Sequence, residues 1–130
     1  MKKIFATVFV CLLLVTSSVH AQIFKDAEGF SYINNNNYLV FSSGNKSCSA
    51  YDLSSIHILA NDDSRFEFNV IVVHCSNGDG IISTTDVANI REDYATGNIF
   101  MDGKPLGDYR QWGKTQREIY YKMKSAALSR

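Results

Sequence analysis

The histidines and cysteines are the side chains of this sequence best suited to acid–base or nucleophilic chemistry, and His74 and Cys75 are consecutive. They end the run RFEFNVIVVHC at 65–75, whose alternating apolar and polar residues predict a β-strand. Successive residues of a strand point to opposite faces of a sheet, which disfavours a catalytic His74–Cys75 pair. No triad motif surrounds His57 or His74, so we interpret His74 as a half-buried imidazole bonded to a neighbour.

Two pairs of adjacent carboxylates, Asp62 with Asp63 and Glu92 with Asp93, are the other candidates for hydrolytic chemistry. Turn aspartates commonly accept hydrogen bonds from their own backbone, and we interpret both pairs as turn formers. A small hydrolase would require Asp, Glu or His side chains to converge in space, which the linear order does not indicate. We therefore expect the protein not to be an enzyme.

The segment 75–86 matches part of an EF-hand calcium loop through Asn77, Asp79, Gly80 and Asp86. Its first position is a cysteine where the loop needs an aspartate, and a predicted strand precedes it where an EF-hand has a helix. A glycine-rich hairpin turn explains the same residues. The glycines elsewhere form neither a phosphate-binding loop nor a dinucleotide motif, and we expect no metal and no cofactor.

The first 21 residues have the pattern of a secretory signal peptide. Lys2 and Lys3 precede an apolar run at 4–15, and small residues before the predicted cleavage after Ala21 complete the pattern. The run is shorter than a membrane-spanning helix, and no later segment approaches about 18 apolar residues. We expect a mature chain beginning at Gln22, without a membrane anchor, in the periplasm or at the cell surface.

Residues 22–130 are predicted to form one domain, since this length supports a single modest core. The signal segment holds two of the 13 basic residues and none of the 13 acidic ones, so the remainder has a formal net charge of −2. Binding to nucleic-acid phosphates is thereby disfavoured.

Cys11 lies in the apolar run, which leaves Cys48 and Cys75. An even cysteine count in an exported domain predicts one disulfide between them, whereas their spacing is atypical of metal or redox thiols.

Alternating and β-branched residues predict a mainly antiparallel sheet. Segments 29–33 and 38–43 flank four asparagines and are expected to form a hairpin. A weaker strand is predicted at 53–59, and the clearest one at 65–75. Because residues 70–73 are apolar on both faces, this strand is expected to lie centrally in the sheet.

Residues 81–101 fit two templates. Val87, Ile90 and Tyr94 have helical spacing, with Gly97 as a stop, but the segment around Gly97 also fits a strand, a turn and another strand. We favour strands.

Residues 102–113 contain three glycines and the only proline, and are predicted to form a loop. Residues 115–118 then have the form of a capping box, which predicts that a helix begins there. Its apolar stripe would consist of Ile119, Tyr120, Met123, Ala127 and Leu128. The expected fold class is therefore α+β, a small mainly antiparallel sheet with a C-terminal helix packed on it.

Aromatic residues near the start of this helix are the candidate binding surface. Tyr109 and Trp112 would offer rigid contact area to a protein partner if they are exposed, and core packing or loop anchoring is their alternative role. Arg110, Lys114 and Arg117 would add positive charge suited to an acidic patch.

Several motifs together resemble a known family. They are Tyr51-Asp52-Leu53-Ser54-Ser55-Ile56, the aromatic-rich strand ending in Val73-His74-Cys75, Tyr94-Ala95-Thr96-Gly97, and Trp112 before the last segment. The layout is similar to the surface-adhesin protein E family of small exported proteins of Gram-negative bacteria. The resemblance covers about residues 51–120 and implies a small sheet with a helix, in a family whose named member binds host matrix components. The sequence departs from the family in lacking a cysteine near its C-terminus.

We therefore expect an exported, non-enzymatic, adhesin-like binding domain that contacts another macromolecule. The alternative is an exported inhibitor or immunity protein that blocks a toxin or hydrolase with the loop at 102–113. A host matrix component and a bacterial toxin or enzyme are the corresponding partners. Tyr109, Arg110, Trp112 and Lys114 are the predicted contact residues.

Overall fold

The structure is a computed structural model that describes residues 23–33, 37–44, 47–76 and 81–129. The predicted signal segment 1–21 and the predicted turn at 77–80 lie outside the described residues.

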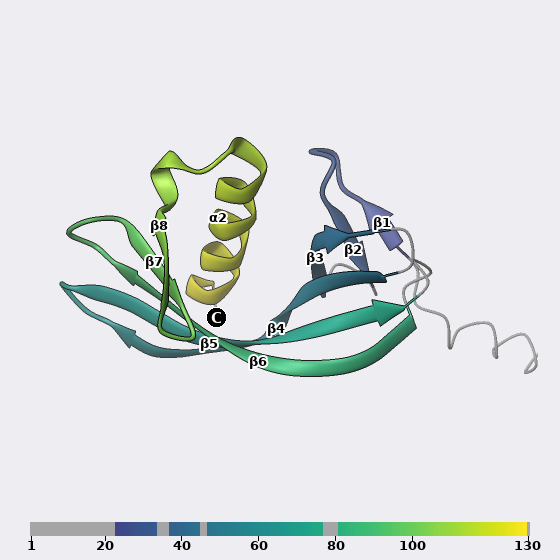
Figure 1. Ribbon diagram of the computed structural model, residues 1–130, viewed down its shortest axis with the longest axis horizontal. Helices are drawn as coiled ribbons and strands as arrows, with labels where there is room; N and C mark the ends of the chain where they lie inside the picture. Colours follow the sequence, from purple (N-terminus) through teal and green to yellow (C-terminus); the bar gives the residue numbers. More distant parts are fainter. Residues whose placement is uncertain (1–22, 34–36, 45–46, 77–80, 130) are drawn as a thin grey trace, which may run out of the picture.

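One antiparallel sheet dominates the fold, and each strand in it pairs with its neighbour in sequence (Figure 1). Its eight strands are β1 (Ile23–Lys25), β2 (Ser31–Ile33), β3 (Tyr38–Ser43), β4 (Ser47–Asn61), β5 (Arg65–Ser76), β6 (Ile81–Asp93), β7 (Asn98–Met101) and β8 (Lys104–Asp108). The 3₁₀ turn η2 (Tyr109–Gln111) leads to the helix α2 (Lys114–Leu128). The predicted α+β class, a mostly antiparallel sheet with a C-terminal helix, is confirmed.

The long central strand β5 has the two-faced pattern predicted from its sequence. Phe66, Phe68 and Val70 are 0–1% exposed and belong to the core that includes α2, whereas Val73 belongs to a separate buried cluster. Because side chains alternate along a strand, this separation places apolar side chains on both faces of β5. The prediction of a central strand, apolar on both faces near residues 70–73, is confirmed.

Residues 81–101 form strands, as favoured, and the helical alternative is wrong. β6 pairs along its length with β5, and β7 returns alongside its end. Gly97 closes the intervening turn at φ +75°, and a Cβ there would lie 2.5 Å from Asp108 Oδ1. Pairing with the long β5 decides this segment, because sheet contacts outweigh a weak helical spacing.

The predicted loop at 102–113 is wrong for most of its length, because β8 and η2 occupy it. Asp102 and Gly103 both have positive φ, 52° and 82°, and connect β7 to β8. Such a pair suits a two-residue hairpin turn. The Asp-Gly dipeptide was the available signal for this hairpin.

Helix α2 begins one residue before the predicted capping box. Gly113 is its N-cap and makes no side-chain cap hydrogen bond, so Thr115 already lies within the helix. The predicted capping interaction is therefore wrong, whereas the helix itself is confirmed. Its buried residues are Ile119, Tyr120, Met123 and Ala127, as predicted; Leu128, the last of the predicted stripe, is 51% exposed.

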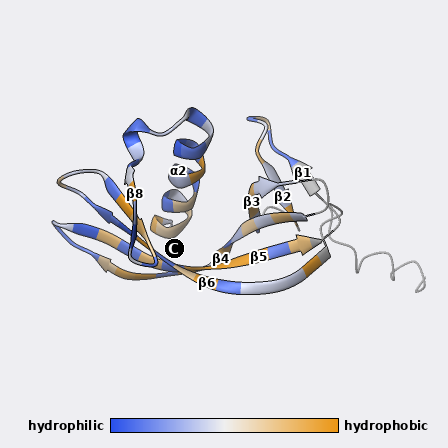
Figure 2. Cartoon of the chain, in the orientation of Figure 1, coloured by the Kyte–Doolittle hydropathy of each residue, from blue (hydrophilic) through white to orange (hydrophobic). Residues whose placement is uncertain are grey.

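The sheet curves around the helix, and α2 lies on the inner side of that curve (Figure 1). Figure 2 shows apolar stretches of β4 and β5 below it. The main core lies between helix and sheet, and it unites residues of strands β2 to β7 with the buried stripe of α2. Burial of this stripe holds the helix in place, because short isolated helices are marginal in water.

A second, smaller buried cluster contains both cysteines, with Ile33, Ala50 and Val73. Cys48 and Cys75 are opposite one another in the β4–β5 register. Their sulfur atoms lie 2.7 Å apart, beyond the roughly 2.05 Å of a disulfide bond. The predicted disulfide is therefore not supported and is corrected: the cysteines are buried neighbours, packed as small apolar side chains.

Candidate functional site

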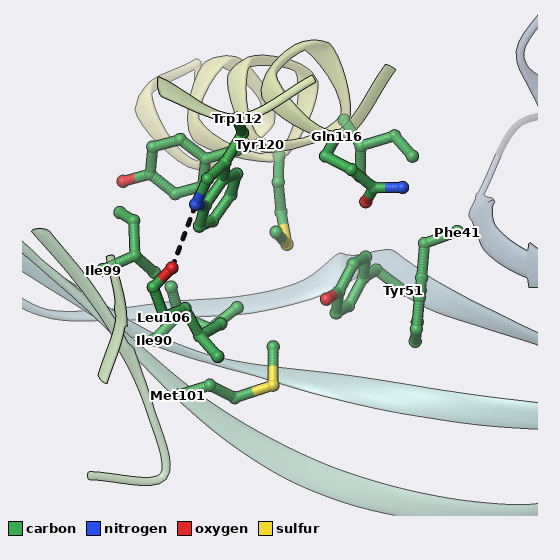
Figure 3. Close-up of a pocket in the computed structure, with 11 residues that line it drawn as sticks. Phe41, Tyr51, Ile90, Ile99, Met101, Leu106, Trp112, Gln116 and Tyr120 are labelled. Atoms are coloured by element: carbon green, nitrogen blue, oxygen red, sulfur yellow. Dashed lines mark hydrogen bonds between the residues drawn. The ribbon is translucent and has the colours of Figure 1, made fainter. Parts of the chain in front are cut away.

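An apolar pocket of about 110 Å³ lies between α2, the sheet and the β7–β8 hairpin (Figure 3). Its lining residues are Phe41, Tyr51, Ile90, Ile99, Met101, Leu106, Trp112, Gln116, Ile119, Tyr120 and Met123. The walls come from seven different elements or connections, so the assembled tertiary fold creates the pocket. Apolar pockets with a few polar groups are the usual form of binding sites.

A β-bulge at the end of the hairpin shapes one wall. The β7–β8 register shifts between Ile99 and Phe100, so Leu106 is an extra residue on β8. The carbonyl oxygen of Leu106 accepts a hydrogen bond of 3.0 Å from the indole Nε1–H of Trp112. This bond joins β8 to the connection before α2 and fixes Trp112 against the pocket.

The polar groups of the pocket wall carry no charge. The indole N–H of Trp112 has its partner in Leu106, and burial raises the pKa of Tyr51 to about 12. Gln116 has an uncharged amide and is exposed on the first turns of α2. Transfer of an unpaired charge into such surroundings is costly, which favours an uncharged ligand.

Behind the pocket, a buried polar contact ties α2 to β6. Residue Glu92 is 4% exposed, and its carboxylate accepts hydrogen bonds from the Tyr120 hydroxyl at 2.7 Å and from Lys124 Nζ at 2.9 Å. Burial and the Glu92 carboxylate raise the pKa of Tyr120. Lys124 Nζ also lies 5.6 Å from the ring centroid of Phe66. These contacts fix the helix over the sheet and so set the width of the pocket.

Of the predicted contact residues, Tyr109 and Trp112 are partly buried and pack against the main core. Their ring centroids are 6.5 Å apart, and Tyr109 lies 5.1 Å from Tyr120 and 5.6 Å from Tyr121. The loop-anchoring role considered for Tyr109 and Trp112 is confirmed. Both side chains are also partly exposed, so the outer edge of this group of aromatic rings contacts solvent.

The predicted cationic residues differ in their surroundings. Arg110 donates hydrogen bonds to Asp108 Oδ1 and Oδ2, each at 2.9 Å, and to the Thr96 carbonyl at 2.7 Å. It thus supports the turn between β6 and β7, and its guanidinium lowers the pKa of Asp108. Lys114 is the exposed first residue of α2. The structure therefore brings the four residues into one region, with Arg110 engaged in an internal ion pair.

Sequence reasoning missed a hydrogen-bonded row of Ser49, His74 and Asp86 on three adjacent strands. Ser49 Oγ lies 3.0 Å from His74 Nδ1, and His74 Nε2 lies 3.0 Å from Asp86 Oδ2. His74 is thus bonded to neighbours, as interpreted. Strand alternation alone could not reveal the row, because it depends on the registers of two strand pairs.

The row contains a hydroxyl, an imidazole and a carboxylate, the three groups of a serine hydrolase. A hydrolase also needs donors for the developing oxyanion and a place for substrate. The Asp86 and His74 side chains are 73% and 38% exposed, and neither residue lines the pocket under α2. Water competes for these hydrogen bonds, so the row is a weak surface network.

The two carboxylate pairs also differ from one another. Asp62 is a turn former, as predicted: its Oδ1 accepts from the Ser64 and Arg65 amides at 2.8 and 3.0 Å, and these bonds lower its pKa. For Glu92 the prediction is wrong, because it lies on β6 and is buried. Its partner on α2 is distant in sequence, so no local pattern could indicate this role.

Among residues 23–33, 37–44, 47–76 and 81–129, no group of three or more His, Cys, Asp or Glu side chains could hold a metal ion. Within the same part of the chain, the helix is too short and too polar to cross a membrane.

Comparisons of the chain with protein-family models, curated proteins and solved structures find no match.

Proposed function

We propose that this protein is an exported, non-enzymatic binding domain that contacts a protein partner in the manner of an adhesin. The observation that supports this most is the apolar pocket, which lies beside a partly exposed aromatic cluster. We call the surface formed by Leu106, Tyr109, Trp112 and Tyr121 the aromatic surface. The contact site is this surface together with the neighbouring cation Lys114.

Rigid aromatic groups around a pocket are features of protein-binding surfaces. Interface hot spots are enriched in aromatic residues and often fill, or form, well-packed pockets. Tyr121 and Leu106 are 44% and 45% exposed although both are large and apolar. Tyr109 and Trp112 link them through ring contacts and the Trp112–Leu106 hydrogen bond. The surface is thus continuous.

The inhibitor alternative has less support. It assigned the blocking role to a protruding loop at 102–113, whereas that segment is β8 and η2, tied to the pocket wall by Trp112. Export and the periplasmic or surface address rest on the signal pattern at 1–21.

The test is capture of a partner by immobilised residues 22–130, offered host matrix proteins and bacterial envelope extract in parallel. Tyr121→Ala removes an exposed aromatic ring from the aromatic surface, and Leu128→Ala is the matched control, because Leu128 is 51% exposed on the same helix. We expect one saturable partner whose affinity falls about tenfold with Tyr121→Ala and is unchanged with Leu128→Ala.

Saturable capture from the matrix proteins supports the adhesin-like function, and capture of one bacterial enzyme or toxin supports the inhibitor. Absence of saturable binding in both, or equal loss with the two variants, contradicts the proposal.

A further inference from the structure

We infer that the pocket receives one uncharged apolar group, about the size of a benzene ring, and that this group is a phenylalanine or leucine side chain of the partner. The inference rests on the proposed function and assigns the pocket a ligand class.

The size fits a single ring or branched aliphatic group. An engineered 150 Å³ cavity lined by leucine, isoleucine and phenylalanine side chains in another protein stays dry and binds benzene. The present pocket, of about 110 Å³, is somewhat smaller. Met101 and Met123 both line it, and methionine side chains adjust to irregular occupants because they are unbranched and flexible. A ring-sized group can therefore enter with small rotations of these two side chains.

The wall chemistry excludes a charged ligand. Two of its polar groups are engaged: the Trp112 indole N–H donates to Leu106, and the Tyr120 hydroxyl donates to Glu92. The Tyr51 hydroxyl remains neutral below about pH 12. No lining residue is an acid, a lysine or an arginine, so a charged group would enter without a counter-charge.

The opening favours a side chain that belongs to a polypeptide. Leu106, 45% exposed, and the exposed Gln116 both line the pocket, so a side chain can enter while its backbone stays outside. The Gln116 amide can both donate to and accept from a peptide group at this place. The adjoining rings of Tyr109 and Tyr121 offer contact to the flanking residues. One buried anchor surrounded by weaker contacts is the usual arrangement at protein interfaces.

The chain provides its own probes for a direct test. Met101 and Met123 are the only methionines after residue 21, and both line the pocket. Residues 22–130 labelled with ¹³C at the methionine methyl groups would be titrated with benzene and followed by NMR. We expect saturable shifts of both methyl signals. Absence of saturable shifts overturns the inference.

Leu106→Phe provides the blocking variant, since it enlarges an exposed side chain at the pocket. Leu59→Phe is the matched control, because Leu59 is 49% exposed on β4 and does not line the pocket. We expect Leu106→Phe to weaken benzene binding about tenfold and Leu59→Phe to leave it unchanged. Equal binding by the two variants contradicts the assigned site. A cooperative unfolding transition and dispersed amide spectra would establish that each variant is folded.

The source of the group is tested with capped tripeptides in the same titration. Acetyl-Gly-Phe-Gly-amide is expected to move the same methyl signals and to compete with benzene, whereas acetyl-Gly-Ala-Gly-amide is not. Binding of benzene without binding of the phenylalanine peptide overturns the side-chain source and assigns the pocket to a free small molecule. Partner capture that is sensitive to Tyr121→Ala but not to Leu106→Phe overturns this inference and leaves the proposed function standing.

Discussion

The buried contact under α2 and the exposed row further along the central strands have similar hydrogen-bond lengths and very different surroundings. Glu92 receives bonds of 2.7 and 2.9 Å, and His74 makes two of 3.0 Å. The Glu92 side chain is 5% exposed, whereas that of Asp86 is 73% exposed. Burial, more than bond length, separates the two regions.

This difference indicates that the Glu92 contact stabilises the fold more than the Ser49–His74–Asp86 row does. Removing one partner of a buried charged contact leaves the other without solvent, whereas an exposed group replaces its lost partner with water. The Glu92 contact fixes α2 and therefore the walls of the apolar pocket. The Ser49–His74–Asp86 row joins three strands that are already paired along their backbones. The pocket side is the better candidate for function.

The largest effect should come from Glu92→Ala. It leaves the Lys124 ammonium and the Tyr120 hydroxyl without their acceptor, and we expect a loss of about 3 kcal/mol in the free energy of unfolding. Urea denaturation measures this value. A loss below about 0.5 kcal/mol is typical of surface substitutions. It would contradict the claim that burial makes the Glu92 contact more stabilising than the exposed row.

Tyr120→Phe should have the next largest effect, because it deletes one hydrogen bond to a buried carboxylate and keeps the ring. We expect a loss of about 2 kcal/mol by urea denaturation, since bonds to charged groups are worth about 1.5–3 kcal/mol. Tyr121→Phe on the same helix is the control, as Tyr121 is 44% exposed. Equal effects of the two changes would contradict a specific role for the buried hydroxyl.

Alkaline pH should destabilise the pocket side through Tyr51. Its proton leaves near pH 10 in the unfolded chain and near pH 12 in the folded one, so this contribution to folding stability falls as the pH rises between these values. By pH 11 the expected loss is about 1 kcal/mol. The measurement is the difference between wild type and Tyr51→Phe in urea denaturation at pH 8 and pH 11. The same pH dependence in both proteins would refute the assignment.

The smallest effect should come from the exposed row. Ser49→Ala and Asp86→Asn are each expected to change the free energy of unfolding by less than about 0.5 kcal/mol, because water replaces the lost contacts. A loss above about 2 kcal/mol in either variant would mean that the row contributes as much to folding stability as the Glu92 contact does. Labelling of wild type by a fluorophosphonate, absent in Ser49→Ala, would give the row a catalytic role.

The sequence allowed the main elements to be predicted where local patterns and burial agree. The alternation of Phe66, Phe68 and Val70 indicated the central strand, and the spacing of Ile119 and Met123 indicated the buried stripe of the helix. Both patterns repeat over several residues, so one exception does not erase them. The hairpin at Asp102 and Gly103 was not predicted, because the proline and three glycines of 102–113 indicated a loop.

The site was harder to predict because its parts meet only through tertiary packing. Trp112 was singled out from composition, but its partner Leu106 depends on a β-bulge that no periodicity indicates. Glu92 meets Tyr120 across 28 positions of sequence. The even number of cysteines after residue 21 correctly indicated that Cys48 and Cys75 are neighbours. Their adjacent positions on paired strands do not by themselves produce a disulfide bond.

The most direct test of the account is the affinity of the captured partner for Leu106→Phe and Leu59→Phe, measured side by side by surface plasmon resonance. The two leucines are similarly exposed, and only Leu106 lines the pocket. We expect a loss of about tenfold for Leu106→Phe and no change for Leu59→Phe. Equal affinities for the two variants would contradict the claim that the pocket under α2 is the binding site.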